Sequence, residues 1–249
     1  MKISLIIPCY NEELNIQKGV LDKIDNYTKD RSDFIEILIV DDGSTDSSVK
    51  IITEKYLKKF PKFRLIQNPH QGKAYAIMTG IRQARGDYVF FSDFDLATPI
   101  EEAEKLIRQV KNKESIIIGS RKTKRQGAPL IRKVQSIGFI IIRDLLVGLQ
   151  GVRDTQCGFK MFEKSAALRI LDKLQVFKDR SSIKGSSVSA GFDLEFLFLA
   201  SKIGYNIIEV PVTWHHVETK NVHFIRDTIE TLKDLIRIRL NDLRGIYEK

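Results

Sequence analysis

The strongest constraint on the fold is a repeated alternation of short β-branched segments with longer amphipathic ones. Five apolar runs bounded by turn residues are predicted to be strands, at 3–8, 35–40, 64–67, 88–92 and 115–119. The segments between them are predicted to be helices, at 11–27, 47–60, 74–84 and 99–110. Successive strand–helix–strand units favour a mainly parallel sheet with helices on both faces, because right-handed crossovers join parallel neighbours.

The alternation breaks at a basic segment, residues 121–127, and resumes in a different pattern. A helix at 192–203, a strand at 206–211 and a long C-terminal helix at 224–243 are predicted there. A length of 249 residues suits a single α/β domain with one continuous core. We therefore expect one domain, 1–249, in the α/β class.

Composition limits the class of protein and its partners. Hydrophobic residues make up 43% and charged residues 29%, which is typical of a folded chain, and the net charge of +9 favours an anionic partner. Nucleic acid is not the expected one, because aromatic residues are not interleaved with the basic segment. Cys9 and Cys157 form no CxxC pair, so neither a disulfide framework nor a zinc site is predicted, and a reducing cytoplasm is expected.

The longest apolar stretch, 134–149, is too short to span a membrane. It is shorter than the roughly 20 residues that a spanning helix needs, and it contains Arg143 and Asp144. If the protein meets a membrane, we expect it to lie on the surface.

Acidic residues follow two of the predicted strands. Asp41 and Asp42 come after the second strand, and Asp93 and Asp95 come after the fourth. Ligands of open α/β sheets bind beyond the carboxyl ends of the strands, so these side chains are expected at one edge. Each motif alone is also compatible with a solvated acidic turn. Together they indicate a Mg²⁺ or Mn²⁺ site, since close carboxylates repel unless a cation screens them.

Several longer motifs resemble one enzyme family across nearly the whole chain. They are IIPCYNEE, ILIVDDGSTDSS, QGKAYAIMTGIRQARGDYVFFSDFDLATP, GSRK, DTQCGFKMF, FDLEFL and EVPVTWHH. The chain resembles the inverting family 2 glycosyltransferases with the GT-A (Rossmann-like) fold. Within them, DFDLAT and DTQCGFK make it most similar to the dolichyl-phosphate and other polyprenyl-phosphate β-glucosyltransferases, since mannosyl-transferring relatives commonly carry Gln at the position of Ala97.

The resemblance implies a set of donor-binding residues. Those expected around the nucleotide sugar are Pro8, Tyr10, Glu12, Asp41, Asp42, Gly72, Lys73, Asp93 and Lys220. Asp95, with Asp93, would ligate a Mg²⁺ or Mn²⁺ ion bound to the diphosphate. Lys73 could equally be a solvated lysine at the start of a helix, and Glu218-Thr219 depart from the family pattern before Lys220.

The resemblance also implies an acceptor-phosphate site formed by Arg121, Arg132 and Ser136. Helical spacing places Arg132, Ser136 and Arg143 on one face of a helix at 132–149. The opposite face carries Ile137, Ile141, Leu145 and Leu149. Such a helix suits the headgroup layer of an anionic membrane, and the alternative is a core helix with an Arg143–Asp144 ion pair. The helix at 224–243 also has an apolar stripe, formed by Ile225, Ile229, Leu232, Ile236, Leu240 and Leu243. This stripe could pack on the core, lie on a membrane or bind a membrane-anchored protein partner.

Two carboxylates are candidates for the catalytic group, Asp193 and Asp154. A sugar hydroxyl would need one of them as a general base. A phosphate monoester, with a second pKa near ~6, is already mostly a dianion at neutral pH. With a lipid-phosphate acceptor, the carboxylates would orient groups more than remove protons, and the sequence does not rank the two.

Taken together, the resemblance implies a metal-dependent inverting glycosyltransferase, with a nucleotide-sugar-binding half at 1–120 and an acceptor-binding half at 121–249. UDP-glucose and a polyprenyl phosphate are the expected substrates, at the cytoplasmic face of a membrane. The alternative is a family 2 enzyme that uses GDP-mannose or another UDP-sugar, or a hydroxyl of a polysaccharide. A binding module without catalysis is a rival of another class, opposed by the acidic strand ends.

Overall fold

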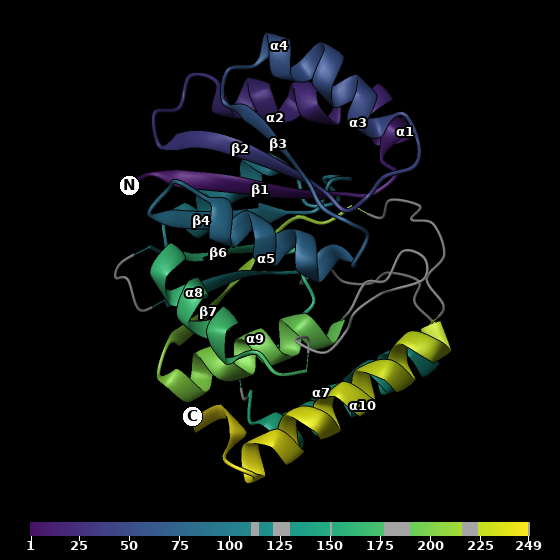
Figure 1. The fold of residues 1–249 in the computed structure, drawn as a ribbon. Helices are drawn as coiled ribbons and strands as arrows, with labels where there is room; N and C mark the ends of the chain where they lie inside the picture. Colours follow the sequence, from purple (N-terminus) through teal and green to yellow (C-terminus); the bar gives the residue numbers. More distant parts are fainter. Residues whose placement is uncertain (111–114, 122–129, 150, 177–189, 216–223, 249) are drawn as a thin grey trace.

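One mixed sheet forms the centre of the computed structural model. The model describes residues 1–110, 115–121, 130–149, 151–176, 190–215 and 224–248, apart from the side chains of 130–137, 139, 190 and 224–228. Within these residues the strands are β1 (Ile3–Cys9), β2 (Phe34–Asp41), β3 (Phe63–Gln67), β4 (Tyr88–Ser92), β5 (Ser115–Ser120), β6 (Phe159–Glu163) and β7 (Asn206–Pro211). Their order is β3-β2-β1-β4-β6-β5-β7, and all neighbours pair in parallel except those of β6 (Figure 1). The predicted sheet is confirmed.

The antiparallel strand β6 was not predicted from the sequence. It lies between β4 and β5, with Lys160 opposite Phe91 on one side and Ile118 on the other. The run FKMFE is only five residues long, and its charged second and last positions interrupt the continuous apolar run that is typical of a strand buried on both faces. Because β6 is central, it brings residues 154–160 to the edge of the sheet where the acidic residues lie.

Helices of the first half follow the predicted positions but are more interrupted. They are α1 (Glu13–Gln17), α2 (Val20–Thr28), α3 (Ser48–Ile51), a π-helical turn η1 (Ile52–Tyr56), α4 (Leu57–Lys59), α5 (Lys73–Gln83), a 3₁₀ turn η2 (Ile100–Glu102) and α6 (Ala103–Ile107). The predicted helix 11–27 divides at Gly19, whose φ of 77° lies in the left-handed region that glycine tolerates.

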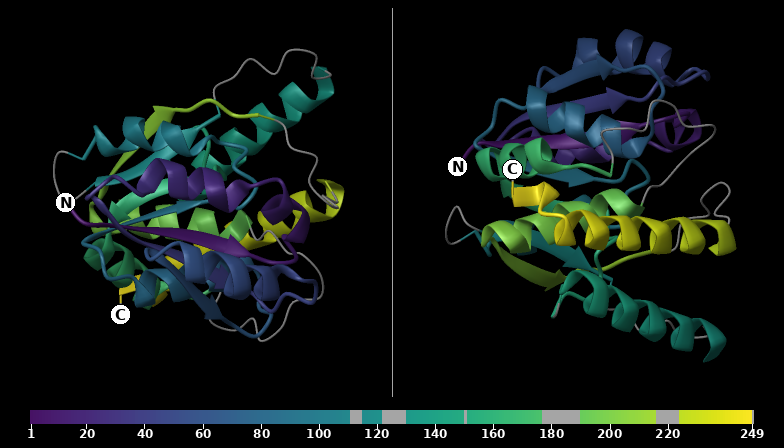
Figure 2. Two further views of the ribbon diagram at one scale, coloured as in Figure 1. Left: turned by 90° about the horizontal axis from the view of Figure 1, so that it is seen from above. Right: turned by 60° about the horizontal axis from the view of Figure 1, so that its bottom comes forward.

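Helices of the second half are α7 (Leu130–Val147), α8 (Lys164–Lys173), α9 (Ala190–Ile203) and α10 (Phe224–Leu243), followed by a 3₁₀ turn η3 (Ile246–Glu248). Helices α7 and α10 overlap in the view of Figure 1, and α10 contacts both α7 and α9. Figure 2 shows α7 and α10 apart along most of their lengths. Among the described residues, none of the helices combines the length and the hydropathy needed to cross a bilayer.

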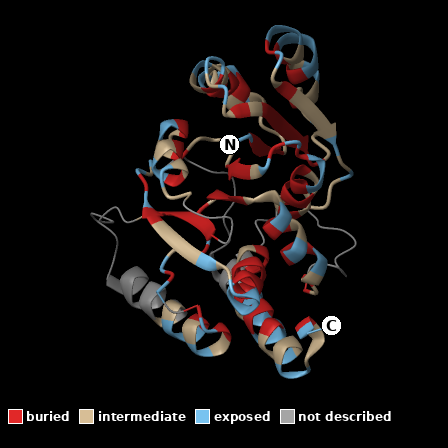
Figure 3. Cartoon of the chain, turned by 90° about the vertical axis from the view of Figure 1, so that its left-hand side faces the viewer, coloured by how far each residue is buried: buried red, intermediate tan, exposed pale blue. Residues whose placement is uncertain are grey.

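One hydrophobic cluster lies on each face of the sheet, because successive side chains along a strand point to opposite faces. In β1, Ile6 contributes to a cluster that includes residues of α5, α8 and α9, whereas Leu5 and Ile7 contribute to one beneath α2 and α6. Figure 3 shows the strands largely buried and the outward sides of the helices exposed. Burial on both faces fixes the register of the strands and therefore the positions of the residues that follow them.

The structure corrects the expected faces of the helix at 132–149. Arg143 is 1% exposed, because its guanidinium donates to Asp144 and to the carbonyl of Val152, so it does not lie on a solvent-facing basic face. Leu149 is buried just beyond the helix, whereas Ile141 and Leu145 are 61% and 82% exposed. The apolar exposed face is thus present at these two residues, and Arg143 anchors the other side of the helix.

Candidate active site

The turn after β2 separates the roles of two adjacent carboxylates. Asp41 accepts hydrogen bonds from the backbone N–H groups of Gly43 and Ser44, so its side chain shapes its own turn. Asp42 instead accepts from the N–H groups of Gln71 and Gly72, at 2.9 and 2.7 Å. Both side chains are nearly fully buried, and only Asp42 connects the end of β2 to the segment that begins α5.

An aromatic pair lies beside Asp42. The rings of Tyr10 and His70 are stacked, with centroids 4.3 Å apart and planes 12° from parallel. His70 Nδ1 lies 2.8 Å from Asp42 Oδ2. Pro8 belongs to the end of β1 and Tyr10 directly follows that strand, which pairs with β2 through Cys9 and Asp41, so the first two strands bring these groups together.

Glu12 also lies at this end of the sheet. Its carboxylate accepts a hydrogen bond from Asn15 Nδ2 at 2.6 Å, and its backbone N–H donates to Ser48 Oγ. The preceding residue, Asn11, has φ of 54°, which is uncommon for a residue with a side chain. Its side-chain oxygen accepts from the backbone of Thr45, so the strained turn after β1 is held to the turn after β2.

Lys73 and Asp93 form an ion pair between the start of α5 and the end of β4. Burial disfavours the charged ammonium of Lys73, but Asp93, Asp193 and Asp95 together outweigh this effect and raise its pKa. Burial also raises the pKa of Asp95, and the neighbouring charge of Asp93 adds to the rise. Two carboxylates and an ammonium are therefore concentrated where β4 ends.

Gly158 lies directly against the carboxylate of Asp93. A Cβ atom built on Gly158 would be 2.2 Å from Asp93 Oδ1, which is closer than any side-chain carbon can approach. A side chain at position 158 would therefore force the carboxylate of Asp93 to move. The Gly of the DTQCGFK motif lets the segment before β6 approach this carboxylate closely.

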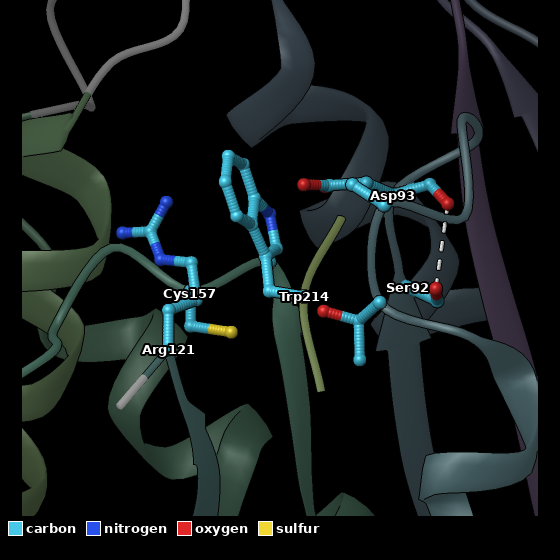
Figure 4. A pocket seen from close by; sticks show the side chains of 8 residues that line it. Ser92, Asp93, Arg121, Cys157 and Trp214 are labelled. Atoms are coloured by element: carbon cyan, nitrogen blue, oxygen red, sulfur yellow. Dashed lines mark hydrogen bonds between the residues drawn. The ribbon is translucent and has the colours of Figure 1, made fainter. Parts of the chain in front are cut away.

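A pocket opens between Asp93 and the end of β5. It is lined by Ser92, Asp93, Ala97, Thr98, Arg121, Cys157, Gly158 and Trp214. Figure 4 shows Asp93 on one side, Arg121 on the other and the indole of Trp214 between them. The centre of the Arg121 guanidinium lies 6.0 Å from the centroid of the Trp214 ring. The pocket therefore has an acidic wall, a basic wall and an aromatic wall.

Asp154 fixes the side chain of Arg121, which forms the basic wall of the pocket. Nε and Nη2 of Arg121 each lie 2.7 Å from an oxygen of the Asp154 carboxylate. Burial works against the ionised form of Asp154, but the hydrogen bonds and charge of Arg121 outweigh it and lower its pKa. The two residues are thus a bidentate ion pair, the strongest geometry for these groups.

The other candidate carboxylate, Asp193, lies in the first turn of α9 and is paired with Lys160 of β6. Lys160 Nζ lies 2.6 Å from Asp193 Oδ1 and 2.6 Å from the carbonyl oxygen of Cys157. The Lys160 side chain is 1% exposed and that of Asp193 is 19% exposed. Both candidate catalytic carboxylates are therefore engaged by cations.

Contacts connect several of the predicted site residues at the carboxyl ends of the parallel strands. Those joined by a hydrogen bond, an ion pair or a neighbouring charge are Asp42, Gly72, Lys73, Asp93, Asp95, Arg121, Asp154 and Asp193. Lys220 lies outside the described residues. Arg132 and Ser136 are placed on α7, but their side chains are outside the described part of the chain. The sequence did not indicate His70, Lys160 or Trp214 as site residues.

Carboxylate oxygens are the right donors for a divalent ion, but the protein alone supplies few of them. Within the residues that the structure describes, no three His, Cys, Asp or Glu side chains are grouped closely enough to hold a metal ion. Mg²⁺ commonly takes one or two carboxylates and completes its shell with water and substrate phosphates. The mutual repulsion of Asp93 and Asp95 fits such a partial site.

Comparison with known proteins identifies the family. The family model for glycosyl transferase family 2 matches residues 4–171. The chain belongs to this family. The dolichyl-phosphate beta-glucosyltransferase of Dictyostelium discoideum is 33% identical, over 99% of this chain and 76% of its own length. The enzyme of the same name from Saccharomyces cerevisiae is 32% identical, over 98% of this chain and 76% of its own.

A solved structure of low sequence identity shows the same fold. Glucosyl-3-phosphoglycerate synthase of Mycobacterium tuberculosis in complex with UDP superimposes with a TM-score of 0.66 at 17% identity, covering 96% of this chain and 80% of that one. The same enzyme with Mn²⁺, UDP and glucosyl-3-phosphoglycerate gives a TM-score of 0.60. This similarity confirms the GT-A type of fold that the motifs implied for this glycosyltransferase.

Proposed function

We propose that this protein transfers glucose from UDP-glucose to a polyprenyl phosphate of the dolichyl type, with inversion at the anomeric carbon. The observation that carries the proposal is the similarity to dolichyl-phosphate beta-glucosyltransferases, one of which is 33% identical over 99% of the chain. The arrangement of charge supports it, because acidic and basic side chains face each other across one pocket. We divide the domain accordingly into a donor half, 1–120, and an acceptor half, 121–249.

The end of the sheet formed by β1 and β2 is proposed to bind the nucleoside. A carboxylate such as that of Asp42 can accept the N–H of a uracil ring, and the Tyr10–His70 pair offers an aromatic surface beside it. Pro8, Glu12 and Asp41 support the same turn. In the present structure Asp42 accepts backbone N–H groups of 71 and 72, so donor binding would have to share or displace those bonds.

The diphosphate is proposed to lie beside Lys73, Asp93 and Asp95. Asp93 and Asp95 would hold a Mg²⁺ or Mn²⁺ ion, which when bound supplies charge stabilisation for the departing nucleoside diphosphate. Lys73 is close enough to Asp93 to pair with it, and its raised pKa keeps it cationic and able to donate to a phosphate oxygen. Gly72, with φ of 97°, lets the backbone turn into α5 at this point. Lys220 is proposed to reach the same phosphates.

The acceptor phosphate is proposed to enter the pocket beside Arg121. Asp154 fixes the guanidinium by two hydrogen bonds, so that a cation is already oriented there before the acceptor binds. Arg132 and Ser136 of α7 are proposed to contact the same phosphate. A phosphate dianion needs no general base, so the role of Asp193 and Asp154 is to orient cations, with the phosphate oxygen itself displacing UDP.

An anionic membrane surface is the proposed location, since a polyprenyl acceptor is embedded in one. Ile141 and Leu145 of α7 and Leu240 and Leu243 of α10 are exposed apolar residues on two helices that contact each other. Such faces suit the headgroup layer, or a membrane-anchored protein partner. The two free cysteines support the cytoplasmic face, where thiols stay reduced.

The experiment is a matrix of donors and acceptors. The protein is incubated with UDP-glucose, GDP-mannose or another UDP-sugar, each with polyprenyl phosphate, polyprenol or an oligosaccharide, in Mn²⁺ or in EDTA, and products are identified by mass. We expect polyprenyl-phosphate-linked glucose from UDP-glucose, and none with polyprenol or EDTA. Transfer of another sugar, or transfer to an oligosaccharide hydroxyl, would replace the proposal by the alternative family 2 activity.

A further inference from the structure

The central antiparallel strand carries a buried lysine that no sequence pattern indicated. Lys160 is paired in register with Phe91 of β4 and Ile118 of β5, and its side chain is 1% exposed. The residues around this position are Ile77, Ile81, Phe91, Lys160, Phe162, Phe192, Asp193 and Phe196. Apart from Lys160 and Asp193, every side chain in this group is apolar.

The ammonium of Lys160 has specific partners within this apolar environment. It donates to Asp193 Oδ1 and to the carbonyl oxygen of Cys157, both at 2.6 Å. It also lies 5.2 Å from the centroid of the Phe91 ring, within the range of a cation–π interaction. The charge is therefore compensated by a carboxylate, a carbonyl dipole and an aromatic face.

Stability alone does not explain a charged pair at this position. Removing two charges from water is costly, and replacing a buried ion pair by apolar side chains of similar volume is often neutral or stabilising. A purely structural role would be met equally well by an aliphatic residue in β6, like its neighbour Met161. The positions of the groups that Lys160 contacts explain the pair better.

The two hydrogen bonds of Lys160 reach two different parts of the candidate site. One end is Asp193, in the first turn of α9 and close enough to Lys73 to contribute to its raised pKa. The other is Cys157, whose neighbour Gly158 lies against the carboxylate of Asp93. Lys160 thus bridges α9 and the segment that limits the position of Asp93.

We propose that Lys160 is a positioning residue for the glycosyl transfer, acting through Asp193 and Cys157 to fix the carboxylates around the diphosphate site. Through its bond to Asp193 it fixes the orientation of that carboxylate. This inference rests on the proposed transferase activity but not on the identity of the sugar. It assigns a role to a residue that does not itself touch substrate.

A double-mutant cycle tests whether Lys160 acts through Asp193. Lys160→Met, Asp193→Asn and the double variant are compared with the wild type in kcat and in KM for the nucleotide sugar. We expect Lys160→Met to lower kcat roughly ten- to a hundredfold, the usual scale for losing a charge-assisted hydrogen bond, with KM changed less than about threefold. Because the residues act as one unit, the double variant should be no more than about threefold below Asp193→Asn.

A matched lysine provides the control. Lys62 donates from Nζ to two backbone carbonyl oxygens, of Thr28 and Arg31 at 2.6 and 2.8 Å, and it precedes the first residue of β3, at the opposite end of the strand from the site. Lys62→Met should leave kcat within about twofold of the wild type although it loses two hydrogen bonds of a lysine side chain. Lys160→Arg, which retains the cation, should recover part of the kcat that Lys160→Met loses.

The outcomes separate this inference from the proposed function. The cycle is run with whichever donor and acceptor the wild type uses, so a sugar other than glucose would end the glucose proposal and leave the test of Lys160 intact. The positioning role would be overturned if the double variant lost kcat by the product of the two single losses. It would also be overturned if Lys160→Met folded and kept the kcat of the wild type. If Lys160→Met does not fold, Lys160→Gln, which keeps a donor and removes the charge, takes its place in the cycle with the same criteria.

Discussion

The carboxylate of Asp154 accepts two hydrogen bonds from the guanidinium of Arg121, one from Nε and one from Nη2, each at 2.7 Å. The backbone N–H of Arg121 donates to the same carboxylate at 3.0 Å. The sequence predicts that Arg121 binds the acceptor phosphate and that Asp154 is one of two candidates for the catalytic carboxylate. The pair shows that they are a single unit, in which Asp154 sets the direction of the Arg121 side chain toward the pocket.

The ion pair predicts a specific dependence of stability on pH. The pKa of Asp154 is lower in the folded state than its ordinary value of 3.8, so its contribution to stability is present above that pH and is lost as the pH falls through the folded pKa. Asp154→Asn should therefore be less stable than wild type at pH 7, by roughly 1–3 kcal/mol. The difference in Tm should shrink as the pH falls below about 3.8.

Thermal unfolding between pH 3 and pH 7 measures this difference. Asp30→Asn, a change at an exposed aspartate, is the control and should show a difference in Tm that is small at every pH. A Tm difference for Asp154→Asn that stays constant or grows toward acid pH would show that the ion pair does not carry the stability assigned to it.

Asp95→Ala should abolish metal-dependent donor binding and transfer while leaving the fold intact. The carboxylate that would neutralise the metal is removed, and the loss of several kcal/mol of charge stabilisation corresponds to at least about a hundredfold in kcat/KM. Calorimetry of UDP with and without Mn²⁺ measures donor binding, and Asp30→Ala is the control. Transfer within a few fold of the wild type, with Mn²⁺ still required, would exclude Asp95 as a metal ligand.

Gly158→Ala should impair the site without unfolding the protein. The new Cβ would lie 2.2 to 2.4 Å from the carboxylate atoms of Asp93, and a side-chain end can move where backbone cannot. We expect UDP binding in Mn²⁺ to weaken roughly tenfold or more, because a ligand displaced by about an ångström loses its geometry. Gly138→Ala, where an added Cβ meets nothing within 4 Å, is the matched control. Equal affinities of the two variants for UDP would contradict a role for the position of Asp93.

Exposed apolar residues on α7 predict reversible binding to membranes. Each basic residue near an anionic bilayer contributes about 1 kcal/mol, an attraction that salt screens, whereas apolar insertion is not screened. Co-sedimentation with anionic liposomes should therefore weaken with salt but persist. Replacing Ile141 and Leu145, which are 61% and 82% exposed, by Asp should remove the salt-resistant part.

The control for that measurement is Ile203→Asp at the end of α9, an apolar residue that is 37% exposed on a different helix. It should sediment with liposomes as the wild type does. Wild-type protein that stays wholly in the supernatant at low salt would show that α7 does not bind the membrane surface by itself.

The sequence by itself determined the parallel part of the sheet, the helices between its strands and the acidic residues at the strand ends. Local patterns suffice there, because strands buried on both faces read as continuous apolar runs and the carboxyl ends of parallel strands must share an edge. Family motifs along the chain added the type of enzyme and most of the site residues, such as Asp42, Asp93 and Asp95.

Tertiary structure alone decided how the charges are paired. Lys160 lies in a short strand that pairs antiparallel with β4 and β5. No pattern in the sequence around it predicts that its ammonium will contact Asp193, which is 33 residues later in the chain. Arg143 likewise reads as part of a basic helix face, yet its guanidinium is buried against the carbonyl of Val152. The physical reason is the same in both cases: a charge is buried only where distant parts of the chain supply its partners, and periodicity along a segment contains no information about them.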